Sequence, residues 1–193
     1  MNLDSHFWSK KYKQHQTGWD IGYAAPPIIS YFNQVENKNI KILIPGCGNA
    51  YEAIYLFEKG FRNIYILDFV KETLNKFEEK VPDFPKSQIL HTDFFNLEDQ
   101  FDVIVEQTFF CALLPDQRNE YVTKMKSLLN PKGKLIGVFF DIKFEKLGPP
   151  FGGNKEEYQE LFSSHFKIKR LEKCYNSIPP RMGNELFFIF EVN

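Results

Sequence analysis

From about residue 40 onward, short apolar segments alternate with segments that show the apolar spacing of amphipathic helices. The apolar segments have the length and the content of branched and aromatic residues that are typical of strands. They lie at residues 40–45, 63–69, 88–91, 101–107, 134–141, 166–172 and 185–192. The helical patterns lie between them, at residues 51–59, 72–80, 116–129 and 155–164. This alternation predicts βαβ units around a largely parallel sheet.

The connection between the last two predicted strands is of a different kind. It contains Pro179, Pro180 and Gly183 and no helical pattern, so the two strands are expected to pair as an antiparallel hairpin. We therefore predict an α/β fold: a Rossmann-like, doubly wound, seven-stranded sheet that is mostly parallel and has an antiparallel C-terminal hairpin. Residues 1–35 are rich in aromatic side chains and lack strand alternation. We expect them to form a helical cap over the carboxyl edge of the sheet, with residues 36–193 as the core of the same single domain.

Composition and charge narrow the classes of partner. A chain of 193 residues fits one domain, and 24 Lys and Arg against 25 Asp and Glu give a net charge of −1. This balance provides no positive field for nucleic acid. No apolar run approaches the roughly 20 residues that span a membrane, and the first residues lack the pattern of a secretory signal. We expect a cytoplasmic monomer whose three cysteines are reduced thiols.

A glycine-rich turn follows the first predicted strand. Its sequence is Pro45-Gly46-Cys47-Gly48-Asn49, and Asp68 ends the next strand. Open α/β sheets bind ligands outside the carboxyl ends of their strands, where glycine lets the backbone approach a ligand and an acid can accept hydrogen bonds from ribose hydroxyls. The pattern suggests an adenosine site. Tyr51 stands where a pyrophosphate-binding turn has its third glycine, which argues against NAD.

A second acid follows the third predicted strand. Asp93 can accept a hydrogen bond from an exocyclic amine, while Phe94 can stack on a purine ring. For Phe95 we favour a place in the core.

Together with the Pro131-x-Gly133 turn before the fifth strand, these features resemble the class I S-adenosylmethionine-dependent methyltransferases. More specific blocks are similar to the thiopurine S-methyltransferase family, which includes thiol and halide methyltransferases, over nearly the whole chain. These blocks are Phe7-Trp8 with Tyr12, Gly18-Trp19-Asp20-Ile21-Gly22, Pro45-Gly46-Cys47-Gly48, Thr108-Phe109-Phe110-Cys111-Ala112, Arg118 and Gly148-Pro149-Pro150-Phe151.

The resemblance implies S-adenosylmethionine as cofactor and assigns residues to it. The implied cofactor-binding residues are Trp8, Tyr12, Trp19, Gly46, Cys47, Gly48, Asp68, Phe69, Asp93, Phe94 and Gln107. The first three would close over the cofactor, although Tyr12 departs from a Trp in the plant branch of the family. Gln107 and Glu106 stand where that branch has Tyr and Asp. The implied substrate pocket contains Glu106, Phe109 and Phe110.

Arg118 matches an arginine near the substrate in the thiopurine enzymes and is our candidate catalytic residue. The alternative, an Arg on a helix surface paired with Glu120 or solvent, stays open. Cys47 and Cys111 are interpreted as small packing residues rather than nucleophiles.

Methyl transfer to an anion needs alignment and exclusion of water more than acid–base groups. Aromatic walls suit this task because their faces attract a sulfonium. The four histidines are scattered, so we expect no metal and no general base.

We predict methyl transfer to a small-molecule acceptor that is a soft nucleophile: a thiol, a thiopurine sulfur or a halide. The alternatives are methylation of tellurite or another oxyanion, methylation of an oxygen or nitrogen acceptor, an NAD-linked oxidoreductase, and a protein that binds a nucleoside without catalysis.

Overall fold

A computed structural model describes residues 1–192 of the chain; Asn193, the last residue of the predicted core, lies outside the described residues. Seven strands form one sheet in the order β3-β2-β1-β4-β5-β7-β6. They are β1 (Ile42–Pro45), β2 (Ile64–Asp68), β3 (Ile89–His91), β4 (Phe101–Gln107), β5 (Leu129–Phe140), β6 (Phe166–Lys173) and β7 (Glu185–Val192). Strands β1 to β5 are parallel, whereas β7 runs antiparallel to both β5 and β6. The predicted sheet and its C-terminal hairpin are confirmed.

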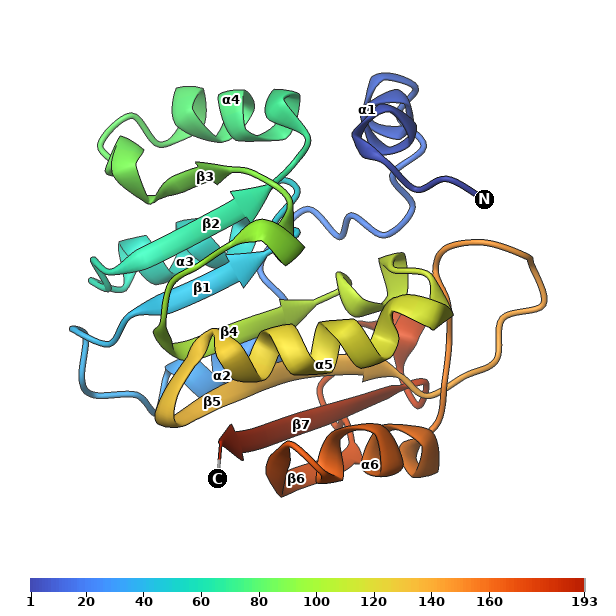
Figure 1. Ribbon diagram of the computed structural model, residues 1–193. Coiled ribbons are helices and arrows are strands. Elements are labelled where there is room, and N and C mark those ends of the chain that lie inside the picture. The colour runs from blue at the N-terminus through green and yellow to red at the C-terminus, as the bar shows by residue number, and fades with distance from the viewer. Residues whose placement is uncertain (193) are drawn as a thin grey trace.

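Helices cover both faces of the sheet, as Figure 1 shows. One face packs against α2 (Pro26–Phe32), α3 (Tyr51–Glu58) and α4 (Lys71–Lys80), and the other packs against α5 (Arg118–Ser127) and α6 (Lys155–Ser163). Side chains of successive strand residues point to opposite faces of the sheet. Ile42 and Ile44 pack on the face covered by α2, α3 and α4, and Leu43 packs on the face covered by α5 and α6. Burial of both faces explains why the parallel strands are almost continuously apolar in sequence.

The N-terminal segment divides into two parts. Helix α1 (Ser5–Lys13) lies beyond the carboxyl ends of the parallel strands (Figure 1) and has no buried residue. Asp4 begins it by accepting a hydrogen bond from the Phe7 amide. Helix α2, which we expected to belong to the cap, instead packs in the helical layer, with Ile28 and Phe32 buried. Ile28 and Phe32 are four residues apart and therefore share one face of the helix, and this apolar face is buried in the core.

Short 3₁₀ turns connect several elements. They lie at Lys86–Gln88, Phe94–Asn96, Phe110–Ala112, Pro115–Gln117 and Pro179–Arg181. Strand β5 begins at Leu129 rather than near residue 134 because Leu129 already pairs with Phe101 of β4, before a register shift. No helix in the described part of the chain is long and apolar enough to cross a membrane.

Candidate active site

The glycine-rich turn after β1 bends tightly along the carboxyl edge of the sheet. Gly46 and Gly48 have φ angles of +57° and +52°, which residues with a side chain rarely adopt. The Cys47 amide donates to the Leu67 carbonyl at 3.1 Å, and the Gly48 amide donates to Asp68 Oδ2 at 2.9 Å. The turn is therefore tied to the end of β2, where the predicted ribose-binding acid lies.

Asp68 is buried, and both its oxygens accept backbone hydrogen bonds. Oδ1 accepts from the Val70 amide and Oδ2 from the Gly48 amide, each at 2.9 Å. Burial raises the pKa of Asp68, while these N–H groups favour the charged form and oppose the increase. A carboxylate oxygen can accept two hydrogen bonds, so Asp68 keeps acceptor capacity for a pair of hydroxyl groups.

Two rings lie directly against the glycine turn. A Cβ atom added to Gly46 would overlap the ring of Phe109, and one added to Gly48 would lie 2.5 Å from Tyr12 Oη. Tyr12 comes from α1 and Phe109 from the turn after β4. The structure thus brings three of the predicted motifs to one place, and only glycine leaves them enough room.

The aromatic residues of the cap contact one another edge to face. The Trp19 ring lies 5.4 Å from that of Trp8 and 5.8 Å from that of Tyr12, measured between centroids. Asp20, the next residue, accepts hydrogen bonds from Asn49 in the glycine turn and from Tyr51 in α3. The Trp19-Asp20 block therefore connects the cap to the turn: the Trp19 ring contacts α1, and the Asp20 carboxylate accepts hydrogen bonds from the turn and from α3.

Glu106 lies in the interior beneath the turn that follows β4. Its Oε1 accepts from the amides of Phe109 and Phe110 at 2.8 and 2.9 Å, and its Oε2 accepts from Tyr121 Oη. These bonds hold Thr108 at a φ angle of +58°, a strained value for a branched residue. Burial raises the pKa of Glu106 to about 7, although the hydrogen bonds oppose the change. Glu106 therefore fixes this turn from below, a role that the substrate-pocket prediction did not foresee.

Gln107, at the end of β4, has a buried Oε1 atom with no hydrogen-bond partner among the described residues. A buried amide oxygen without a partner is unfavourable unless a ligand or water donates to it. Together with the acceptor capacity of Asp68 and the glycine turn, this oxygen fits a polar nucleoside-containing cofactor at the carboxyl edge.

A small cavity lies beside the turn, between β4, β5 and α6. It is lined by Glu106, Thr108, Phe110, Cys111, Val138, Phe139, Phe140, Tyr158 and Glu185, and it leaves room for about one water molecule. Burial raises the pKa of the Cys111 thiol, and burial together with the Asp68 carboxylate raises that of Cys47. Both thiols stay protonated, which agrees with their interpretation as packing residues.

Arg118 begins α5 and turns toward the loop before α6. Its Nη2 donates to the Gly152 carbonyl at 2.7 Å, and its guanidinium lies 4.8 Å from the centroid of the Phe110 ring. Its buried Nε has no partner among the described residues. The alternative of an ion pair with Glu120 is wrong, because this side chain packs on the turn after β4.

The third predicted motif is arranged differently from our expectation. Asp93 is exposed and accepts a hydrogen bond from the Phe95 amide. Phe94 is only 3 % exposed and packs against Phe109 and Tyr121, while Phe95 is half-buried. The 3₁₀ turn at Phe94–Asn96 directs Phe94 into the core, while Phe95 packs against the same core as expected but keeps part of its ring exposed. Phe69, the predicted neighbour of Asp68, is half-buried at the end of β2.

Phe110, a predicted pocket residue, is 1 % exposed; it belongs to the core and lines the small cavity. The sequence reasoning missed Arg181, whose Nη2 donates to the Trp19 carbonyl at 2.7 Å. The only local signal is its place in a proline- and glycine-rich loop between two strands. Within residues 1–192, no group of three or more His, Cys, Asp or Glu side chains could hold a metal ion.

Comparisons with known proteins agree with this geometry. The sequence profile of the thiopurine S-methyltransferase family matches residues 3–191. Probable thiol methyltransferase 2 of Arabidopsis thaliana is 30 % identical over 184 residues, which cover 92 % of this chain and 81 % of that protein. Thiopurine S-methyltransferase of Vibrio parahaemolyticus is 28 % identical, with 84 % and 83 % covered.

Solved structures show the same fold. The 1,6-didemethyltoxoflavin-N1-methyltransferase of Burkholderia thailandensis, solved with bound 1,6-didemethyltoxoflavin and S-adenosylhomocysteine, superposes with a TM-score of 0.81 at 16 % identity, covering 99 % of this chain and 88 % of that one. Magnesium protoporphyrin IX methyltransferase of Synechocystis, solved with S-adenosylmethionine, gives a TM-score of 0.74 at 11 % identity, covering 100 % and 98 %.

The family match favours methyl transfer over the alternatives of a dehydrogenase or a protein that binds a nucleoside without catalysis. The glycine turn, Asp68 and the free amide oxygen of Gln107 agree with it. The chain belongs to the thiopurine S-methyltransferase family and is an S-adenosylmethionine-dependent methyltransferase.

Proposed function

We propose that this enzyme methylates a small, soft, anionic acceptor, with a thiol or thiopurine sulfur first and a halide second. The observation that carries the proposal is the position of Arg118: its guanidinium lies against the Phe110 ring, and its buried Nε has no hydrogen-bond partner within residues 1–192. An unpaired N–H of a guanidinium favours a negatively charged ligand. The names of relatives, such as thiol and thiocyanate methyltransferase, support the same acceptor class.

We propose that the residues predicted from the sequence divide into two groups. Asp68, Gln107 and the backbone of the turn at Gly46, Cys47 and Gly48 would line the part of the site that holds the nucleoside and amino-acid ends of S-adenosylmethionine. Trp8, Tyr12 and Trp19 would cover it, with Asp93 and Phe69 at its adenine end. Phe109 and Arg118 would face the acceptor, with the buried ring of Phe110 packed against the Arg118 guanidinium. Glu106 would act only by holding Phe109 and Phe110 in place.

When bound, S-adenosylmethionine supplies a methyl group activated by a positively charged sulfur. The protein then has to align an acceptor lone pair with that methyl group and exclude water. Aromatic rings suit such a site for two reasons. Their faces attract the positively charged sulfonium, and they solvate a soft anion weakly. Glu106 already accepts three hydrogen bonds and is buried, so it is not placed to take a proton from an acceptor. This arrangement favours acceptors that are ionised before they bind.

The test measures S-adenosylhomocysteine formation with bisulfide, an aromatic thiol, a thiopurine, iodide, tellurite and a catechol, beside a control without acceptor. We expect turnover with the sulfur and halide acceptors. The Arg118→Ala variant should raise the KM of the acceptor about tenfold and leave cofactor affinity unchanged. The matched control is Lys126→Ala, at the exposed end of the same helix. Turnover confined to the catechol or tellurite, or no turnover with any acceptor, would contradict the proposed acceptor class.

We also propose a single-domain monomer that works in the cytoplasm. All three cysteines are free, which fits a reducing compartment. Sedimentation velocity that gives a dimer would contradict the monomer, and location of a tagged protein outside the cytoplasm would contradict the compartment.

A further inference from the structure

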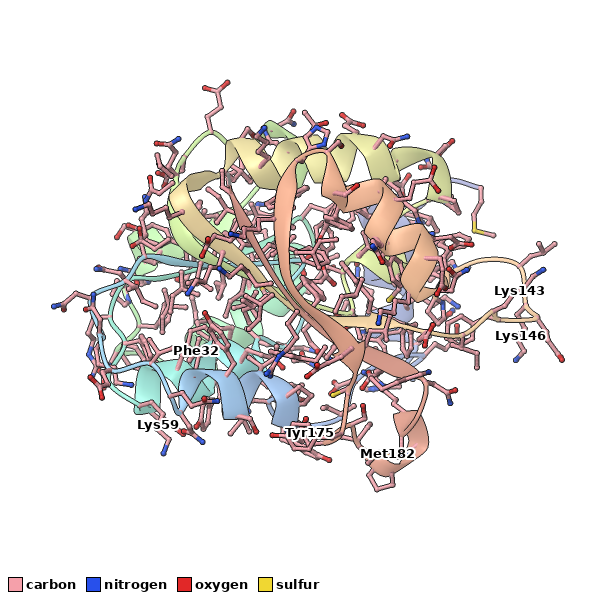
Figure 2. All side chains as sticks on the ribbon, turned by 90° about the horizontal axis from the view of Figure 1, so that it is seen from below. Phe32, Lys59, Lys143, Lys146, Tyr175 and Met182 are labelled. Atoms are coloured by element: carbon pink, nitrogen blue, oxygen red, sulfur yellow. The ribbon has the colours of Figure 1, made fainter. Side chains whose placement is uncertain are left out.

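Arg181 lies in the loop that joins β6 and β7, and its side chain turns inward. It is 11 % exposed, whereas its neighbour Met182 is 50 % exposed and Tyr175, earlier in the same loop, is 78 % exposed. Figure 2 shows both of these residues on the outer side of the connection. A buried guanidinium in an exposed loop has to be paired, because transferring a charge from water without a partner is strongly unfavourable.

The partners of Arg181 lie on the sheet and in the cap. Its Nη1 lies 3.5 Å from Oε1 of Glu185, the first residue of β7, and Glu185 is itself buried opposite Phe140 of β5. Its Nη2 donates to the Trp19 carbonyl at 2.7 Å. The guanidinium thus joins the rigid sheet to a cap residue 162 positions earlier in the chain. Its geometry suits this role, because a planar fork can bind two acceptors in fixed directions.

The position of Trp19 affects the glycine turn indirectly, through the rings of α1 that Trp19 contacts. Its ring lies against Trp8 and Tyr12 of α1, and Tyr12 Oη lies over Gly48 of the glycine turn. Helix α1 itself buries no residue, so few other contacts fix its position. The remaining anchors of α1 are bonds from Ser9 and Lys13 to Glu72, and the ion pair that Lys13 makes is exposed. Displacement of Trp19 would therefore displace the rings that cover the turn.

We propose that Arg181 is a positioning residue for the cofactor: it fixes the Trp19 backbone and thereby holds the aromatic cap over the glycine turn. Its charge is already compensated by Glu185, which distinguishes it from Arg118, whose Nε has no partner in the described part of the chain. The C-terminal hairpin, which lies outside the parallel part of the sheet, thus contributes to cofactor affinity. This inference rests on the use of S-adenosylmethionine and is independent of the proposed acceptor.

The test compares Arg181→Ala and Arg181→Lys with the wild-type enzyme. Arg170→Ala, in which an exposed arginine of the same hairpin is removed, is the matched control. Hydrogen exchange of residues 5–20 is measured on the ligand-free protein, S-adenosylhomocysteine affinity by calorimetry, and KM and kcat in steady state. We expect Arg181→Ala to speed exchange in residues 5–20 several-fold and to weaken S-adenosylhomocysteine binding about tenfold. The control should change neither quantity.

Arg181→Lys keeps the positive charge opposite Glu185 but cannot bind Glu185 and the Trp19 carbonyl at the same time in the way a planar guanidinium does. This variant should therefore remain folded and show the same two effects at smaller size. A rise in the acceptor KM alone, with cofactor affinity and exchange unchanged, would overturn the proposal and make Arg181 an acceptor ligand. A lower Tm with unchanged cofactor affinity would also overturn it and leave a purely structural role. Failure of every acceptor would count against the proposed acceptor class only, because exchange and calorimetry need no acceptor.

Discussion

The Tyr121 hydroxyl donates a hydrogen bond of 2.6 Å to the Glu106 carboxyl group inside the core. Tyr121 lies on α5 and is fully buried. The other Glu106 oxygen accepts the amides of Phe109 and Phe110, and Phe109 lies against Gly46. A buried acid therefore connects the helical layer to the wall of the candidate active site.

The first prediction concerns the pH dependence of stability. The pKa of Glu106 is raised to about 7 from an ordinary value of 4.5, so the folded protein binds more protons than the unfolded chain between these values. The contribution of Glu106 to the free energy of unfolding should be full below pH 4.5 and should be lost as pH rises through about 7, by an amount on the order of 3 kcal/mol. Glu106→Gln should remove this loss. The difference in the free energy of unfolding between pH 5 and pH 8 is measured by urea denaturation. Glu120→Gln, on the surface of α5, is the control. An unchanged pH dependence in Glu106→Gln would show that another group is responsible.

The second prediction concerns the glycine turn. Gly46→Ala should lower cofactor affinity more than tenfold, because the new methyl group overlaps the Phe109 ring and the backbone has a positive φ angle. Gly60→Ala is a matched control: its φ angle is +89°, yet nothing lies within 4 Å of the added atom. Both variants should lose about 1 kcal/mol of stability through backbone strain. Only Gly46→Ala should lose binding in calorimetry with S-adenosylhomocysteine, and equal binding by both variants would contradict the contact.

The third prediction tests the proposed ribose-binding acid. Asp68→Asn keeps the shape of the side chain but removes the negative charge, so cofactor affinity should fall about tenfold to a hundredfold. The control is Asp102→Asn at the opposite edge of the sheet, because Asp102 also accepts a backbone bond, from the Lys41 amide at 2.8 Å. Calorimetry measures both variants. Full affinity in Asp68→Asn would exclude the proposed role.

The fourth prediction concerns the cap. The exposed Glu72 carboxylate binds Ser9 and Lys13 of α1, and these contacts lower the pKa of Glu72 to about 2. Because α1 buries no residue, its amides should exchange faster than those of β4, and cofactor should slow this exchange. Glu72→Gln should speed it further, and less so at high salt, which screens an exposed pair. Exchange in residues 5–13 that cofactor leaves unchanged would mean that α1 is already fixed without ligand.

The local pattern of the chain determined most of the fold. Strand-length apolar segments such as 101–107 have to be buried on both faces, and a loop without a helix between β6 and β7 leaves antiparallel pairing as the short connection. The glycine turn and Asp68 were also predictable, because in a parallel sheet they must lie at one edge. Each of these features depends on residues that are close in sequence or on a rule that holds for every sheet of this kind.

The tertiary structure decided the rest. The sequence alone did not show that Phe94 is buried, because a 3₁₀ turn sets the direction of its side chain. It gave no indication that Glu106 would hold a turn through Tyr121, or that Arg181 would contact Trp19. Such contacts join distant segments and depend on how the helical layers and the hairpin pack. The chain itself therefore determined where the candidate site lies, and packing determined which side chains shape it.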